Sequence, residues 1–371
     1  MDLDTKKYLY DQIKDLKKDN YDVVLGMSGG VDSTYSLLTF LKEDKKVLGI
    51  YLDLFEDKND TSLKNAKKAE KLAEKFNIDF KIIEMKKYFK EKVQEYFADT
   101  YIEGKTPNPC AICNRDVKIN ILYEISEMLN VPKIATGHYA GIGEFKGNLV
   151  IQKGKEPKKE QSYFLTLIPK EFLKKLCFPL QNVTDKENLR KYLIEENIMT
   201  GESSSDSQDI CFLQNGEHAE FFKNMVYEKN INTKLEDLKT KIYLPNNKVY
   251  NGKYVFSYTI GQRKGLGISY DEPLYVKDIK NNKVILDTKE NMYEKTLKIK
   301  NLNLFIPRYK MPEKVGVKIR YSKNEIPSTI KIDEEKKEAE IIFDEKHIKG
   351  ARGQICAIYS KGFLLGGGII S

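Results

Sequence analysis

Cysteine and histidine are scarce in this sequence, which has five cysteines and three histidines among 371 residues. An odd and small number of cysteines argues against a secreted protein stapled by disulfides. Long apolar runs are absent as well, because no stretch approaches the roughly eighteen uncharged residues of a membrane-spanning helix. The first twenty residues are polar, mixed in charge and unlike a secretory signal peptide. We therefore expect a cytoplasmic protein with reduced thiols and no membrane partner.

Arginine is also scarce, so the net charge of +8 is carried almost wholly by lysine. This charge allows a polyanionic partner but does not require one, because solvated lysine-rich faces would produce the same balance. The length predicts two to three domains. The hydrophobic content of 40% is enough for a sizeable core.

The first third of the chain alternates short apolar runs with helical patterns, which is typical of a parallel sheet with crossover helices. The predicted strands cover 21–27, 47–52, 80–85 and 133–136, and the predicted helices cover 31–41, a stretch from Thr61 or Ser62 to Phe76, 87–102 and 115–130. A doubly wound sheet binds its ligand at the carboxyl ends of its strands, so the first strand–helix turn is the expected site.

The later part of the chain has a different pattern. Two helical stretches are expected between about 170 and 200, and beyond about 240 short β-rich runs alternate with turn dipeptides. We expect an α/β fold in which a doubly wound parallel sheet is followed by a small central domain and a C-terminal antiparallel β-barrel. The expected domain boundaries are 1–212, 213–283 and 284–371.

A glycine-rich turn follows the first predicted strand and reads Gly26-Met27-Ser28-Gly29-Gly30-Val31-Asp32-Ser33. Glycines let the backbone approach a phosphate, and the start of the next helix offers free N–H groups to an anion. The turn lacks the Lys-Ser/Thr pair of GTPases and the spacing of dinucleotide-binding loops. SGGVDS instead resembles the signature of PP-loop ATP pyrophosphatases. That resemblance implies ATP, transfer of AMP to a substrate, and a nucleophile that then displaces AMP.

Two thiols lie three residues apart in TPNPCAICN, where Cys110 and Cys113 precede a helix expected to start near Arg115. A thiol at a helix N-terminus has a lowered pKa, and Arg115 adds positive charge, so reactive thiolates are expected. Cys211 follows a serine-rich loop and is well placed to reach back to this pair. Cys177 and Cys356 lie in apolar runs and are expected to be buried hydrophobic residues.

The cysteines leave two interpretations open. A zinc site is disfavoured, because the chain has no second CxxC and its histidines are scattered. In one interpretation Cys113 and Cys211 form a persulfide or disulfide pair that hands over sulfur. In the other, Cys110, Cys113 and Cys211 hold a [4Fe–4S] cluster whose fourth iron binds sulfide.

Seven segments in order carry a resemblance that extends from about residue 20 to the end: SGGVDS, TPNPCAICN, ATGHYA, EQSYFL, DSQDICF, GQRKGLGI and ARGQ…LGGGII. Together they resemble the bacterial tRNA-specific 2-thiouridylase family, of PP-loop/HUP-like fold. The resemblance implies ATP- and Mg²⁺-dependent adenylation of C2 oxygen of the wobble uridine in tRNAs for Lys, Glu and Gln, followed by replacement of AMP by sulfur. It also implies a sulfur donor, either a cysteine desulfurase, a sulfur-relay protein or sulfide.

The same resemblance implies roles for individual residues. Cys113 matches the nucleophile and Cys211 the cysteine that carries the persulfide. The residues implied in ATP binding are Gly26, Met27, Ser28, Gly29, Gly30, Val31, Asp32, Ser33, Leu52 and Gly137. Asn108, Pro109 and Cys110 match the segment that faces the flipped-out base. The residues implied in tRNA contact are His138, Lys159, Glu160, Gln161, Arg320, Tyr321 and Gln354.

One departure from the family pattern affects the chemistry. Some members carry an aspartate at the position of Cys110, and a thiol cannot replace that carboxylate at neutral pH unless its pKa is lowered. The thiol favours the cluster interpretation, so persulfide and cluster stay equally weighted. The alternatives to the family function are a PP-loop thiolase acting on another RNA and a non-catalytic RNA-binding protein.

Overall fold

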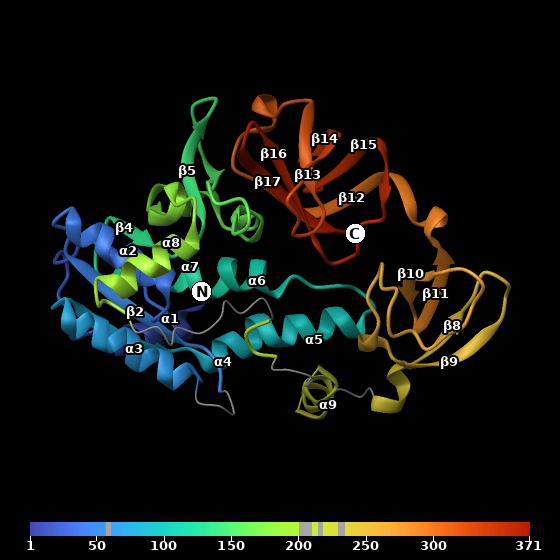
Figure 1. Cartoon of the computed structure of the whole chain (residues 1–371), viewed down its shortest axis with the longest axis horizontal. Coiled ribbons are helices and arrows are strands. Elements are labelled where there is room, and N and C mark those ends of the chain that lie inside the picture. Colours follow the sequence, from blue (N-terminus) through green and yellow to red (C-terminus); the bar gives the residue numbers. More distant parts are fainter. Residues whose placement is uncertain (57–60, 200–209, 214–217, 229–233) are drawn as a thin grey trace.

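A computed structural model describes residues 1–56, 61–199, 210–213, 218–228 and 234–371. Three sheets organise these residues: a parallel sheet, a four-stranded sheet and a large antiparallel sheet that includes a barrel (Figure 1). Within the described ranges, no helix has the length and apolar content needed to cross a membrane.

The N-terminal sheet has five parallel strands in the order β3-β2-β1-β4-β7. Its strands are β1 Val23–Gly26, β2 Val47–Asp53, β3 Asp79–Glu84, β4 Lys133–Ala135 and β7 Leu176–Cys177. Side chains alternate across β1, so Val24 packs on one face with helix α1 (Leu3–Ile13), whereas Val23 and Leu25 pack on the other. Helices α2 (Val31–Lys42) and α3 (Thr61–Lys75) cover that second face. Helices on both faces make the sheet doubly wound, as predicted.

Two of the predicted helices contain π-helical turns. The first consists of α4 (Lys86–Phe89), a π turn at Lys90–Gln94 and α5 (Glu95–Ile102). The second begins six residues earlier than the predicted start at 115, because Asn108 caps it by accepting a hydrogen bond from the Ala111 N–H (3.0 Å) and proline occupies its first position. It consists of α6 (Pro109–Ile112), a π turn at Cys113–Lys118 and α7 (Ile119–Met128).

The region from 140 to 200 differs from the prediction. One α-helix, α8 (Lys186–Glu195), forms in the described part of 170–200, and the remainder consists of strand β7 and 3₁₀ turns at Lys170–Lys174 and Pro179–Asn182. An unpredicted hairpin precedes it, formed by β5 (Ala140–Phe145) and β6 (Asn148–Lys153). Strand β6 pairs with β17 near the C-terminus, so the hairpin joins the parallel-sheet domain to the barrel.

The β-rich remainder forms two separate units. The central sheet has the order β10-β11-β8-β9, with strands β8 Lys239–Tyr243, β9 Val249–Tyr254, β10 Leu274–Lys280 and β11 Lys283–Thr288. Helix α9 (His218–Glu228) packs on it through Phe222, whose ring stacks on Phe256 at 4.5 Å between centroids.

The C-terminal unit is a closed antiparallel barrel of six strands: β12 Tyr293–Leu304, β13 Lys314–Lys318, β14 Ile326–Asp333, β15 Glu338–Ile348, β16 Ile355–Ser360 and β17 Phe363–Ile370. The sheet closes because β12 pairs with β15 on one side and with β17 on the other. The predicted fold class, a doubly wound parallel sheet followed by a small central domain and a C-terminal β-barrel, is therefore confirmed.

Candidate active site

A cavity of about 680 Å³ opens at the carboxyl ends of β1, β2 and β4, where a doubly wound sheet is expected to bind its ligand. Of the residues implied in catalysis, ATP binding and RNA contact, those lining it are Gly26, Met27, Ser28, Asp32, Ser33, Leu52, Gly137, His138, Gln161 and Cys211. Residues from five separate stretches of the chain thus face one space.

The glycine-rich turn is built to hold an anion. Gly30 is the N-cap of α2 and provides no side-chain cap, so the first N–H groups of the helix point to the turn without a side-chain acceptor. Gly29 adopts a φ of +73°, and a Cβ there would lie 2.6 Å from the carbonyl oxygen of Asn65. The Ser28 N–H donates to Ser33 Oγ (3.2 Å), which closes the turn. The turn therefore has an open helix N-terminus and a tight glycine backbone, the features expected of a phosphate loop.

Asp32 lies in the first turn of α2 with both carboxylate oxygens engaged. Tyr139 Oη donates to Oδ1 and Lys186 Nζ donates to Oδ2, each at 2.7 Å. Lys186 is buried, and Tyr139 lies just after the β4 turn that contains Gly137. A Cβ on Gly137 would lie 3.1 Å from Asp32 Cβ, so this turn packs directly on the phosphate loop. Sequence reasoning missed Lys186 and Tyr139.

Burial weakens the acidity of all three candidate thiols. Cys113 is buried, and the loss of solvation raises the pKa of its thiol from 9.0 to about 12. The pKa values of Cys110 and Cys211 are raised for the same reason, although both side chains keep exposed surface. The expectation of a lowered pKa at a helix N-terminus is therefore wrong for this structure, because desolvation outweighs the helix end. All five cysteines are free thiols.

The cation beside the thiols is Lys118, not Arg115. Arg115 donates two hydrogen bonds to Asp116 (Nε to Oδ1 at 2.7 Å, Nη2 to Oδ2 at 2.6 Å), which neutralises its charge. Lys118 lines the cavity, and its ammonium group lowers the pKa of Cys113 and of Cys211 against the effect of burial. The expectation for Arg115 is corrected accordingly.

The π turn explains how Lys118 reaches the thiols. Its ends are Cys113 and Lys118, five residues apart. In an α-helix, residues five apart point to different sides, whereas the i→i+5 bonding of a π turn brings them about one full turn apart on one side. A helix pattern based on 3.6 residues per turn gives no signal for this alignment, so sequence reasoning missed Lys118.

Cys211 is held at the cavity by its neighbour Phe212. The Phe212 ring lies 5.7 Å from Phe89 of α4, 5.5 Å from Phe97 of α5 and 5.5 Å from Phe221 of α9, measured between centroids. Of the motif DSQDICF, residues 206–209 lie outside the described residues. In the part of the chain that the structure describes, no three His, Cys, Asp or Glu side chains are placed to hold a metal ion.

A polar network joins the start of TPNPCAICN to the residue that precedes barrel strand β16. Asn108 and Pro109 are buried, and Asn108 Nδ2 donates to Gln354 Oε1 at 3.4 Å. Gln354 Nε2 donates to the Pro107 carbonyl oxygen at 3.2 Å. Asn108 and Gln354, which are 246 positions apart, thus lie together beside the cysteines. Both are implied in RNA binding.

His138 lines the cavity as a neutral imidazole. Burial lowers its pKa to about 3, and the positive charge of Lys118 acts in the same direction. Its Nδ1 lies 2.7 Å from Thr136 Oγ1. Gln161 Oε1 accepts a hydrogen bond from the Tyr139 N–H at 3.0 Å, which fixes a second neutral side chain at the rim.

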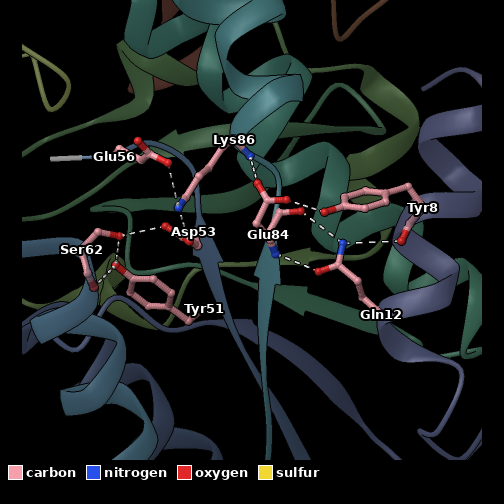
Figure 2. Close-up of polar contacts among 8 residues, drawn as sticks. All are labelled: Tyr8, Gln12, Tyr51, Asp53, Glu56, Ser62, Glu84 and Lys86. Carbon is pink, nitrogen blue, oxygen red and sulfur yellow. Dashed lines mark hydrogen bonds and ion pairs between the residues drawn. The ribbon is translucent and has the colours of Figure 1, made fainter. Parts of the chain in front are cut away.

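The cavity wall formed by β2 and the neighbouring strand β3 are held by polar contacts that the sequence analysis did not identify (Figure 2). Asp53, at the end of β2, accepts hydrogen bonds from Ser62 Oγ (3.1 Å) and pairs with Lys86 Nζ (3.3 Å). On the other side of β3, the Glu84 N–H donates to Gln12 Oε1 of α1 at 2.8 Å. These bonds fix the strand ends against α1, α3 and α4, and thereby one side of the cavity.

Family models match almost the whole chain in three parts. They are described as a tRNA methyl transferase HUP domain over residues 21–215, a tRNA methyl transferase PRC-barrel domain over 230–287 and an aminomethyltransferase beta-barrel domain over 294–370. The chain is 34% identical to tRNA-specific 2-thiouridylase MnmA of Clostridioides difficile over 367 residues, which cover 95% of this chain and 98% of the relative. The chain belongs to the MnmA family of tRNA-specific 2-thiouridylases.

Other MnmA relatives give the same result. The chain is 34% identical to the MnmA of Aquifex aeolicus and 36% identical to MnmA 2 of Clostridium botulinum strain Hall, each match covering 94% of this chain and 98% of the relative. The resemblance stated from the motifs is confirmed.

The remaining residues matched to the MnmA pattern for tRNA contact lie between the parallel-sheet domain and the barrel. Glu160 is buried and accepts a hydrogen bond from Lys318 Nζ of β13 at 3.0 Å, while Lys159 is half-buried. Arg320 and Tyr321 are exposed just beyond β13, and the Tyr321 ring lies 4.8 Å from that of Phe164. Their roles in RNA binding stay predictions.

Proposed function

We propose that this chain converts the wobble uridine of tRNAs for Lys, Glu and Gln to 2-thiouridine. The supporting observation is that the phosphate loop, Lys118 and Cys211 line one cavity. Cys113 lies close enough to Lys118 and Cys211 for their charges to act on its pKa. A site that activates a substrate with ATP and a thiol that carries sulfur need to share one cavity only if the same part of the substrate is first activated and then receives the sulfur.

In the first step, the C2 oxygen of the uridine attacks the α-phosphorus of ATP, and pyrophosphate leaves. The helix α2 N–H groups face the leaving phosphates, and their partial positive charge stabilises the developing negative charge. Mg²⁺ would accompany ATP and be held by its phosphate oxygens, whereas Asp32 keeps both carboxylate oxygens bonded to Tyr139 and Lys186 beside the loop.

In the second step, sulfur replaces AMP. A persulfide on Cys211 attacks C2 through its terminal sulfur, and AMP leaves with the former C2 oxygen. The Cys113 thiolate then attacks Cys211 Sγ and breaks the S–S bond, which releases 2-thiouridine and leaves a Cys113–Cys211 disulfide. A thiol reductant returns both cysteines to the free thiols seen here. Lys118 favours the thiolate that each sulfur transfer requires.

The persulfide is supplied from outside the chain by a cysteine desulfurase or sulfur-relay protein. Sulfide would give the same persulfide only by attacking Cys211 Sγ in the Cys113–Cys211 disulfide left by the previous turnover, which breaks the S–S bond and releases Cys113 as a thiolate. The alternative interpretation places a [4Fe–4S] cluster on Cys110, Cys113 and Cys211. The three thiols would each ligate one iron of such a cluster and leave the fourth iron open to sulfide; this interpretation stays a prediction.

The experiment that tests this function is the release of pyrophosphate from ATP by the purified protein, with and without unmodified tRNA. We expect release that depends on tRNA and stops when uridine 34 is replaced by cytidine. Release that is equally fast with the cytidine-substituted tRNA would contradict the assignment of the acceptor and favour another RNA.

A further inference from the structure

The β5–β6 hairpin presents a charged and aromatic surface at its tip, far from the residues matched to the MnmA pattern. Lys146, in the turn of the hairpin, meets the 3₁₀ turn Arg308–Lys310 that follows β12. We call Lys146, Arg308, Tyr309 and Lys310 the hairpin-tip patch. None of these residues takes part in the mechanism above.

In this patch, Lys146 and Lys310 form hydrogen bonds to each other's backbone. Lys146 Nζ donates to the Lys310 carbonyl oxygen at 2.9 Å, and Lys310 Nζ donates to the Lys146 carbonyl oxygen at 2.8 Å. Each ammonium group is thus directed to backbone rather than to a carboxylate, and among the described residues none of the patch cations forms an ion pair. Arg308 adds a third, exposed charge. Like charges held together without a counterion create a local site for a polyanion.

An exposed aromatic ring lies between these cations. Tyr309 is 82% exposed, and the Lys310 ammonium lies 5.9 Å from its ring centroid. Cationic side chains contact RNA phosphates, and a tyrosine hydroxyl or ring contacts the ribose or an unstacked base. The composition of the patch, three cations and one exposed ring, therefore matches RNA, whose phosphates and bases bind these two kinds of side chain.

The patch is linked to the cavity by the hairpin itself. Strand β5 starts two residues after His138, which lines the cavity, and β6 ends eight residues before Gln161, which also lines it. A strand of six residues spans about 20 Å. The tip therefore lies too far from the cavity for the target base, but within reach of another part of the same RNA.

We infer that the hairpin-tip patch binds the phosphate backbone of the tRNA stem that adjoins the anticodon loop. The identity of the RNA depends on the proposed function, whereas the polyanion site depends only on the contacts above. The stem contact adds affinity that does not depend on sequence, and it positions the tRNA while its wobble base occupies the cavity.

The test is direct binding of a tRNA transcript at several salt concentrations to a K146A/R308Q double variant. For two lost phosphate contacts, the slope of log Kd against log salt should fall by about 2. The matched control is a K67A/K71A variant, which removes two exposed charges from the outer face of α3 and should leave the slope unchanged. A Y309A variant, which keeps all charges, should weaken binding while preserving the slope.

Binding of an RNA limited to the anticodon loop should be the same for the double variant and the unaltered protein. An unchanged slope for full tRNA, or equal weakening with the loop RNA, would overturn the inference. Reduced thiolation with a protein sulfur donor at unchanged tRNA affinity would also overturn it, because the patch would then contact the donor. These binding results do not require thiolation, so they are independent of a failure of the proposed chemistry. Retained ATP binding shows that a variant is folded.

Discussion

Replacing Lys118 by methionine should slow sulfur transfer by changing the acidity of Cys113. Methionine preserves much of the length and apolar character of the lysine stem but removes its charge. The pKa of Cys113 is about 12 even with Lys118 present, because burial opposes the thiolate. Without the ammonium group, the π turn opposes that burial only through the smaller effect of the backbone hydrogen bond from residue 118, so the pKa of Cys113 rises further.

The size of the effect follows from these values. A thiol with a pKa of about 12 is ionised in roughly one molecule in ten thousand at pH 8, so the reaction depends on a small thiolate population. An opposite charge nearby lowers a pKa by about one to three units. K118M should therefore reduce sulfur transfer at pH 8 by about 10- to 1000-fold. Because thiolate is the reactive form, the rise of rate with pH should move to higher pH.

The assay is single-turnover thiolation of tRNA by persulfide-loaded protein between pH 6 and 10, with AMP formation measured in parallel. K118R retains the charge and should keep a profile close to that of the unaltered protein. A K118M profile that superimposes on the original would refute the assigned role of Lys118. Loss of AMP formation in K118M would also contradict it, because the lysine would then act on ATP rather than on the thiols.

Three further predictions test other parts of the site. D32A should lose AMP formation while keeping tRNA affinity, measured by pyrophosphate release and filter binding, because it removes the carboxylate that holds Tyr139 and Lys186 against the phosphate loop; unchanged release would contradict the loop assignment. C113S and C211S should each abolish 2-thiouridine, as seen by nucleoside analysis, and normal turnover in either would disprove the two-thiol route. K318M should lower the free energy of unfolding by about 3–5 kcal/mol in urea titrations, because it leaves the Glu160 carboxylate buried and unpaired; a loss below about 1 kcal/mol would mean that water reaches Glu160.

The features predictable from the sequence are those encoded by local pattern. The Gly26–Ser33 turn between an apolar run and a helix predicted the anion site, and the spacing of strands and helices predicted the doubly wound sheet. The sheet is confirmed, and the turn has the conformation expected from its own residues, because backbone geometry at a strand–helix turn depends on those residues. Anion binding by the turn stays a prediction.

The features that escaped prediction depend on contacts between distant segments or on unusual helical geometry. Lys186 pairs with Asp32 across 154 positions, and Lys318 pairs with Glu160 across 158. The pKa of Cys113 depends on how deeply the helix is buried, which no neighbouring residue encodes. Lys118 lies on the side of Cys113 only because of the π turn. A single sequence has no residue pattern that predicts such a turn.

Nucleoside mass spectrometry tests most directly whether this protein converts the wobble uridine of tRNA to 2-thiouridine. Unmodified tRNA would be incubated anaerobically with persulfide-loaded protein, ATP and Mg²⁺, then digested. We expect a 2-thiouridine peak that requires ATP, originates from position 34 and disappears with C113S. AMP production without any thiolated nucleoside would contradict the proposed sulfur transfer.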